Sequence, residues 1–113
     1  MIVLKTAKGK VELSPEQYSV LSILNYDLIL MAIGDSAKTC MAISKEIGVP
    51  VTTTYTSLKK LIRAGLVEKD ATKHYYLTDK GKEYEKLAEK LKQSGSLELL
   101  KHGGIPVAGG EER

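Results

Sequence analysis

The sequence has no tryptophan and no phenylalanine, so its core must be built from aliphatic side chains, methionine and six tyrosines. Its one cysteine, Cys40, excludes an internal disulfide and a zinc site made of several thiolates. Only two histidines occur, His74 and His102, and they are far apart in sequence. Paired carboxylates, a nucleophile–base set and a phosphate-binding loop are also missing. We therefore expect no enzyme activity, no metal and no cofactor.

Long hydrophobic runs are lacking as well. The longest, residues 20–33, is too short to span a bilayer and carries Asn25 and Asp27. The first residues lack the basic-then-apolar order of a signal peptide. With 113 residues, 42% of them apolar and 27% charged, the chain has the composition of one globular domain. We expect a cytoplasmic protein that associates with the nucleoid, or one in the host cytoplasm if it is viral.

Positive charge is concentrated in the middle of the chain. Residues 38–92 carry twelve basic and seven acidic groups, whereas residues 1–37 carry three and four, and residues 93–113 carry two and three. A basic centre between nearly neutral ends suits a polyanionic partner. The same charges are equally compatible with a lysine-rich surface that faces only solvent.

The first third predicts a short arm followed by a buried helix. Residues 1–13 have the β-branched, alternating character of a hairpin or one extended arm. Ser14, Pro15 and Gln17 form the signature of a capping box, which predicts a helix over residues 15–33. Twelve of the sixteen residues from 18 to 33 are apolar, more than one buried stripe requires. We expect part of that burial to come from a second subunit.

Two more helices are predicted in the middle of the chain. Thr39 is a good N-cap for a helix over 40–47, and Gly48 is a good stop. In the next segment, Val51, Tyr55, Leu58 and Ile62 fall on one side of a helical wheel, which predicts a helix over 51–64 with that side facing the core. We expect Cys40 to be a buried, inert thiol rather than a redox sensor.

A hairpin and a long helix are predicted to follow. Residues 66–70 and 74–78 have strand composition and are separated by a short basic tip, and in the second strand Tyr75 and Tyr76 must point to opposite faces. A helix over 79–92 carries the apolar stripe Tyr84, Leu87, Ala88 and Leu91, which would serve as core or as a dimer seam. We therefore divide the chain into an arm (1–13), one domain (14–92) and a partly flexible C-terminal extension (93–113).

Residues 39–85 carry a family resemblance. The helix ending in Ile47-Gly48, the threonine-rich helix with the Leu-Lys-Lys-Leu run at 58–61, and Tyr-Leu-Thr-Asp-Lys-Gly at 76–81 resemble the winged helix-turn-helix of MarR/ArsR-like transcriptional regulators. The outer helices are similar in arrangement to those of small archaeal or archaeal-virus regulators. The resemblance implies a mainly α fold with a β-hairpin wing (α+β), in which helices 15–33 and 79–92 form a homodimer interface.

The resemblance also implies contacts with double-stranded DNA. A helix at 51–64 would enter the major groove, and a wing at 69–74 would lie on the backbone or minor groove. Short threonine side chains allow close approach, and lysine and arginine pair with phosphates. The expected contacts in the recognition helix are Thr52, Thr53, Thr56, Ser57, Lys59, Lys60 and Arg63. The expected contacts in the wing and flank are Lys38, Lys69, Lys73 and His74.

The leading hypothesis is therefore a dimeric, sequence-specific DNA-binding protein that regulates transcription. The alternative is a winged helix that binds another protein, with an incidental basic face. The binding site in DNA, the sign of regulation and any sensed ligand are open at this point.

Overall fold

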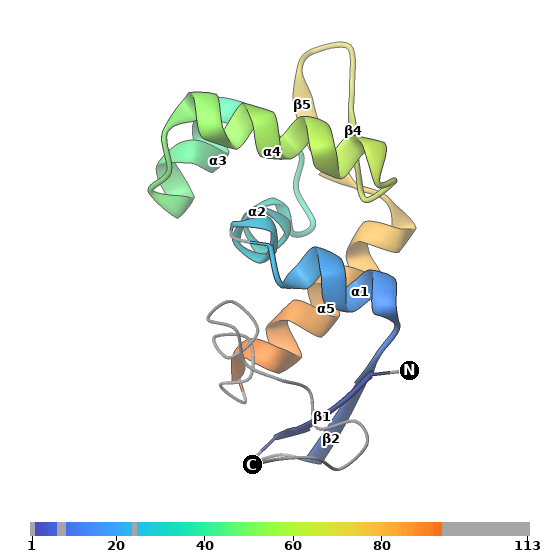
Figure 1. Cartoon of the computed structure of the whole chain (residues 1–113). Coiled ribbons are helices and arrows are strands. Elements are labelled where there is room, and N and C mark those ends of the chain that lie inside the picture. Colours follow the sequence, from blue (N-terminus) through green and yellow to red (C-terminus); the bar gives the residue numbers. More distant parts are fainter. Residues whose placement is uncertain (1, 7–8, 24, 94–113) are drawn as a thin grey trace.

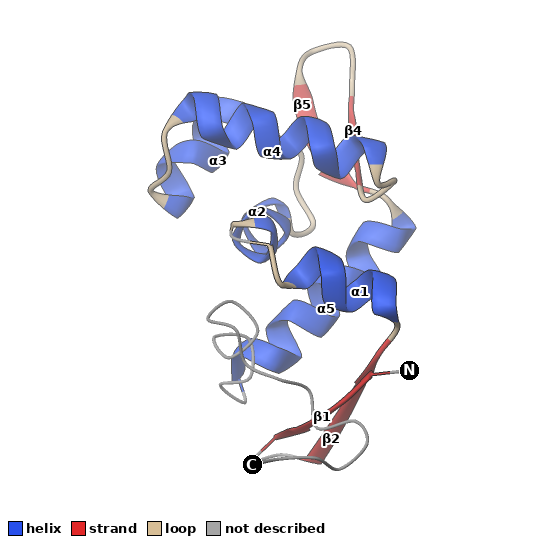
Figure 2. Cartoon of the chain, viewed as in Figure 1, coloured by secondary structure: helices blue, strands red, loops and turns tan. Residues whose placement is uncertain are grey.

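The computed structural model describes residues 2–6, 9–23 and 25–93. Helices predominate, and the strands form two small antiparallel sheets (Figures 1 and 2). The elements are β1 Ile2–Thr6, β2 Gly9–Leu13, α1 Pro15–Leu21, α2 Tyr26–Ile33, β3 Lys38–Thr39, α3 Cys40–Ile47, α4 Val51–Arg63, β4 Val67–Lys69, β5 His74–Leu77 and α5 Asp79–Gln93. The expected flexible extension, including its tail at 95–113, lies outside the described residues apart from Gln93 at the end of α5.

Helix α2 lies at the centre of the helical part of the molecule (Figure 1). It contacts α1, α3, α4, α5 and β5, and it buries Ile29, Leu30 and Ile33 almost completely. Burying an aliphatic side chain of this size contributes roughly 1.5–3 kcal/mol. Contacts within one chain therefore account for the burial of α2, and a contribution from a second subunit to the rest of residues 18–33 stays a prediction.

The prediction of one continuous helix over 15–33 is wrong, because the chain turns between α1 and α2. The hydroxyl of Ser22 donates to the carbonyl of Ser19, and Asn25 adopts a left-handed conformation with φ 76°. Asparagine enters this conformation more readily than most residues, and serine hydroxyls compete for backbone groups near helix ends. The turn lets α1 pack on α5 while α2 enters the core.

The N-terminal strands form the hairpin that was one of two predicted alternatives. Ile2 pairs with Leu13 and Thr6 pairs with Gly9, and the hairpin lies at the end of the molecule opposite the wing (Figure 1). The capping box is confirmed: the Gln17 backbone N–H donates to Ser14 Oγ at 3.1 Å, and the Ser14 N–H donates to Gln17 Oε1 at 2.8 Å.

The second sheet has the strand order β3-β5-β4. The β4/β5 hairpin is the predicted wing, whereas β3, which pairs Lys38 with Tyr75, was not predicted. Tyr75 is buried and Tyr76 is exposed, so the prediction that they face opposite ways is confirmed. The sheet therefore joins the start of α3 to the wing.

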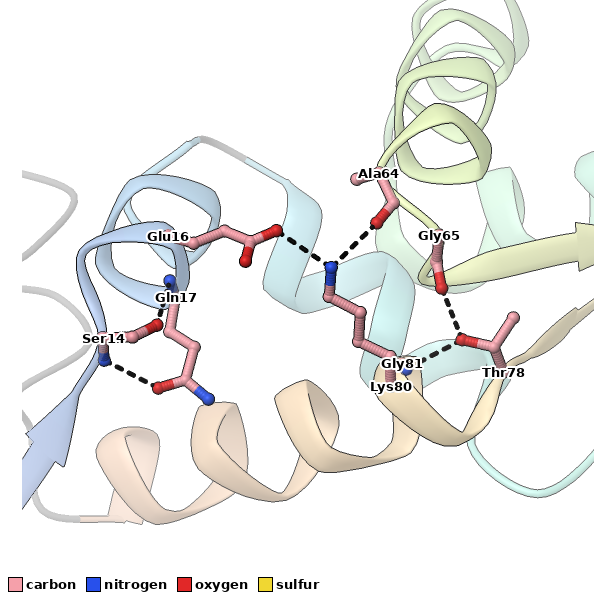
Figure 3. A network of polar contacts seen from close by, with 8 residues as sticks. All are labelled: Ser14, Glu16, Gln17, Ala64, Gly65, Thr78, Lys80 and Gly81. Carbon is pink, nitrogen blue, oxygen red and sulfur yellow. Dashed lines mark hydrogen bonds and ion pairs between the residues drawn. The ribbon is translucent and has the colours of Figure 1, made fainter.

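A close junction joins α5 to the end of α4 (Figure 3). Thr78 Oγ1 donates to the Gly65 carbonyl at 2.6 Å and accepts from the Gly81 N–H at 3.0 Å. The Lys80 ammonium lies 2.9 Å from Glu16 of α1 and 3.3 Å from the carbonyl oxygen of Ala64. The start of α5 is thereby bonded to both α1 and the C-terminal end of α4.

The apolar stripe of α5 is part of the core of its own chain. Tyr84, Ala88 and Leu91 are buried and Leu87 is half-buried, and α5 packs mainly against α2. Of the two predicted roles for this stripe, the structure shows the core. A dimer interface on α5 would have to use the half-buried Leu87 and the exposed residues beside the stripe.

Candidate nucleic-acid interface

Helix α4 buries a different face from the one predicted. Thr54, Leu58 and Leu61 are fully buried, whereas Val51 and Tyr55 are 41% and 43% exposed. Ile62 is also exposed. The inward face is thus rotated by about 60° from the predicted one, at about 100° per residue. Of the predicted inward residues, only Leu58 is correct.

Thr54 can be buried because its hydroxyl has a partner. It donates to the Pro50 carbonyl at 3.0 Å, one turn back along the helix. A buried hydroxyl without a partner costs about 1–3 kcal/mol, and this hydrogen bond removes that cost. The predicted inward face included Val51 and Tyr55 but not Thr54, because the prediction from the helical wheel considered only side-chain hydrophobicity.

The rotation leaves the predicted polar face open. The exposed members of the predicted set are Thr52, Thr53, Thr56, Lys59, Lys60 and Arg63, and Ser57 is half-buried. The Thr56 hydroxyl donates to the carbonyl of Thr52 at 3.0 Å, which leaves its oxygen able to accept. Lys60 and Arg63 make no ion pair with any described residue. Helix α4 has no acidic residue, so this face is uniformly positive.

The wing turn is held by one carboxylate. Asp70 accepts the backbone N–H groups of Thr72 and His74 at 2.8 and 3.0 Å and the Thr72 hydroxyl at 2.7 Å. These bonds favour the ionised form and lower the pKa of Asp70, the largest effect coming from the His74 N–H. Because the Asp70 charge is directed into the turn, the exposed Lys69 and Lys73 define the outer surface of the wing.

Two of the predicted contacts are already engaged within the chain. Lys38 forms an ion pair with Glu46 at 2.9 Å and donates to the carbonyl of Ala32, so it joins α2 to α3. The His74 ring nitrogen Nδ1 lies 3.0 Å from the Thr72 hydroxyl. Both side chains are half-buried.

The sequence did not predict that apolar side chains flank this face, since Val51 and Tyr55 were expected in the core. Met41 of α3 is 57% exposed, and it shares this surface with Val51 and Tyr55 of α4. Cys40 beside them is half-buried rather than buried, and desolvation raises the pKa of its thiol. The exposure of Met41 and its position beside the wing follow from tertiary structure, and no local sequence signal indicated them.

Among the described residues no group of three or more potential metal ligands comes together. No helix within residues 2–6, 9–23 and 25–93 is long and apolar enough to cross a bilayer.

Comparison with known proteins gives two findings. A family model described as "Sugar-specific transcriptional regulator TrmB" matches residues 30–85, just under half of the chain. The structure is similar to that of a possible HxlR family transcriptional factor from Thermoplasma volcanium GSS1, with a TM-score of 0.59 and 24% identity over 84% of this chain and 94% of that chain. No curated protein matches the sequence significantly.

These findings confirm the predicted winged helix, whereas the resemblance to MarR/ArsR-like regulators and to archaeal or archaeal-virus regulators stays a prediction. Residues 30–85 are similar to the helix-turn-helix domain of TrmB-type regulators, and the fold of the chain is a winged helix. Both matches are to transcriptional regulators and not to enzymes.

Proposed function

We propose that the protein is a dimeric regulator of transcription that binds specific sites in double-stranded DNA and acts in the cytoplasm. Helix α4 lies in the major groove, and the wing, residues 69–74, lies on the backbone or minor groove. The observation that carries the proposal is the open, acid-free face of α4 beside the lysines of the wing. The family match covers the winged helix, and we propose no sugar ligand from it.

The residues divide by chemistry into two sets of contacts. Thr52, Thr53 and Thr56 present short hydroxyls near the N-terminus of α4, whose partial positive charge also favours phosphate. Lys60 and Ser57 are placed to reach further into the groove. The proposed phosphate partners are Lys59, Arg63, Lys69 and Lys73. Lys38 and His74 are left out, because the Lys38 ammonium is paired with Glu46 and the His74 ring contacts the Thr72 hydroxyl.

The proposal includes a homodimer. Two copies related by two-fold symmetry would place their α4 helices in two half-sites about 34 Å apart on DNA. The proposed interface uses the outer surfaces of α1, the α1–α2 turn and α5. Ile23 in that turn is 43% exposed, and Leu87 of α5 is half-buried. A molar-mass measurement by light scattering is expected to give twice the mass of the 12.4 kDa chain.

The test is the salt dependence of binding to duplex DNA selected from a random pool. If several phosphates are neutralised, the logarithm of the affinity falls linearly with the logarithm of salt, by about 0.9 per phosphate. Lys60→Glu is expected to lower affinity at least about tenfold, a loss of ~1.4 kcal/mol. Its free energy of unfolding should change by less than about 0.5 kcal/mol, because Lys60 is exposed.

The matched control is Lys10→Glu, which makes the same charge change at an exposed residue of β2, outside both the α4 face and the proposed dimer interface. It should bind as the parent does. If both variants bind equally well, α4 does not contact DNA. If the parent shows no salt-dependent binding, a protein-binding winged helix is the better assignment.

A further inference from the structure

A hollow of about 520 Å³ lies between the start of α3, the first turns of α4 and the wing. Met41, Val51 and Tyr55 line it, and these three apolar side chains are called its floor. These are three of the six large hydrophobic side chains that are exposed in the described part of the chain. Single exposed hydrophobic residues are ordinary, but three around one hollow indicate a binding surface.

The rim of the hollow is positively charged. Lys69 and Lys73 line it together with the Thr72 hydroxyl, and no acidic residue does. The Lys59 ammonium lies 5.1 Å from the centre of the Tyr55 ring, which adds a further cation at the floor. The wing carboxylate is occupied by the backbone of its own turn. The hollow therefore combines an apolar floor with an anion-binding rim.

The hollow is continuous with the proposed DNA-binding face. Val51 and Tyr55 adjoin Thr52 and Thr56 on the same helix, so a duplex in contact with the threonines would pass close to the floor. A DNA strand has the complementary chemistry, because its deoxyribose carbons are apolar and its phosphates are anionic. A small apolar ligand would not account for a rim of lysines, and an acidic peptide would not account for the continuity with α4.

We propose that this hollow holds the sugar-phosphate backbone of one DNA strand. The deoxyribose carbons pack on Met41 and Tyr55, and Lys69 and Lys73 pair with the adjoining phosphates. This inference rests on the proposed DNA-binding function and deepens it. It assigns to α3 and to the apolar side chains a part in affinity that does not depend on charge.

The test separates the contribution of the apolar floor to DNA affinity from that of the charged rim, because only the rim should affect the dependence of affinity on salt. Met41→Gln keeps the length of the side chain but makes it polar, and it should weaken binding about fivefold at every salt concentration with an unchanged slope. Met41→Leu keeps the apolar surface and should bind as the parent does. Lys69→Gln and Lys73→Gln should each reduce the salt slope by about one. Folding is not at risk at Met41, since its side chain is 57% exposed.

Lys10→Gln is the control for the lysine variants, because it removes one exposed positive charge on β2, outside both the hollow and the proposed dimer interface. It should change neither the affinity for DNA nor the salt slope. If Met41→Gln and Met41→Leu bind equally well while Lys60→Glu still weakens binding, the hollow does not hold the strand and the regulator proposal stands. If the parent itself does not bind DNA, both proposals fall together.

Discussion

Replacing Gly81 by alanine tests the junction between the start of α5 and the C-terminal end of α4. A Cβ at this position would lie 2.0 Å from the carbonyl oxygen of Leu66, and ordinary contacts begin at 3.4 Å. The obstacle is backbone, so α5 and the segment after α4 must move apart. That movement also disturbs the hydrogen bonds from the Thr78 N–H to Leu66 and from the Thr78 hydroxyl to Gly65, at 3.0 and 2.6 Å.

Two effects of opposite sign compete in Gly81→Ala. Overpacking costs about 1–3 kcal/mol, and each weakened hydrogen bond costs about 1 kcal/mol. Alanine gains about 1 kcal/mol over glycine in helix propensity. The clash prevails, and we expect a net loss of about 2–4 kcal/mol in the free energy of unfolding, which lowers Tm by roughly 10–25 °C.

The assay is thermal and urea unfolding followed by circular dichroism. Lys82→Ala, one residue further along α5 and exposed, is the control and should change the free energy of unfolding by less than about 0.5 kcal/mol. Gly81→Ala could instead unfold at the same or a higher temperature than the parent. In that case the gain in helix propensity outweighs any steric cost, and the close approach of α5 to the Leu66 carbonyl is refuted.

Three further predictions concern α4, the wing and the thiol. Thr54→Asp should lower the free energy of unfolding by more than about 3 kcal/mol because it buries a charge, whereas Thr52→Asp should fold normally and lose DNA affinity, as unfolding and binding assays will show. The pKa of Asp70 is lowered in the folded wing, so its hydrogen bonds stabilise the turn fully at pH values above the ordinary aspartate pKa. This stabilisation should be lost as the pH falls through the lowered pKa. The pH dependence of the Thr72 amide resonance in NMR spectra should report that lowered pKa. The raised pKa of Cys40 means that iodoacetamide at pH 8 should react more slowly with the folded protein than with the urea-unfolded chain.

The elements that could be predicted from sequence are those with local signals. Ser14 with Gln17 marked the start of α1, Thr39 and Gly48 bounded α3, and Thr78-Asp79 marked the start of α5. The wing strands could be predicted from composition. The exposed side of α4 was largely predicted correctly, because its charged residues must face solvent.

The errors arise where tertiary contacts override local pattern. The turn at Asn25 depends on α1 finding a surface on α5, which no local signal encodes. The inward face of α4 depends on a hydroxyl bonded to Pro50 and on the hollow beside the wing, so Thr54 is buried while Tyr55 is exposed. Strand β3 has two residues and exists only through its partner β5.

The central position of α2 has a consequence for genetics. Helix α2 packs against both α4 and α5, and its residues Leu30 and Ile33 are wholly or almost wholly buried. We expect a substitution there to displace α4, the proposed recognition helix, although neither residue lies on the proposed DNA-binding face. Screens for loss of regulation that sequence only residues 51–74 would therefore miss a class of mutants located in the first third of the chain.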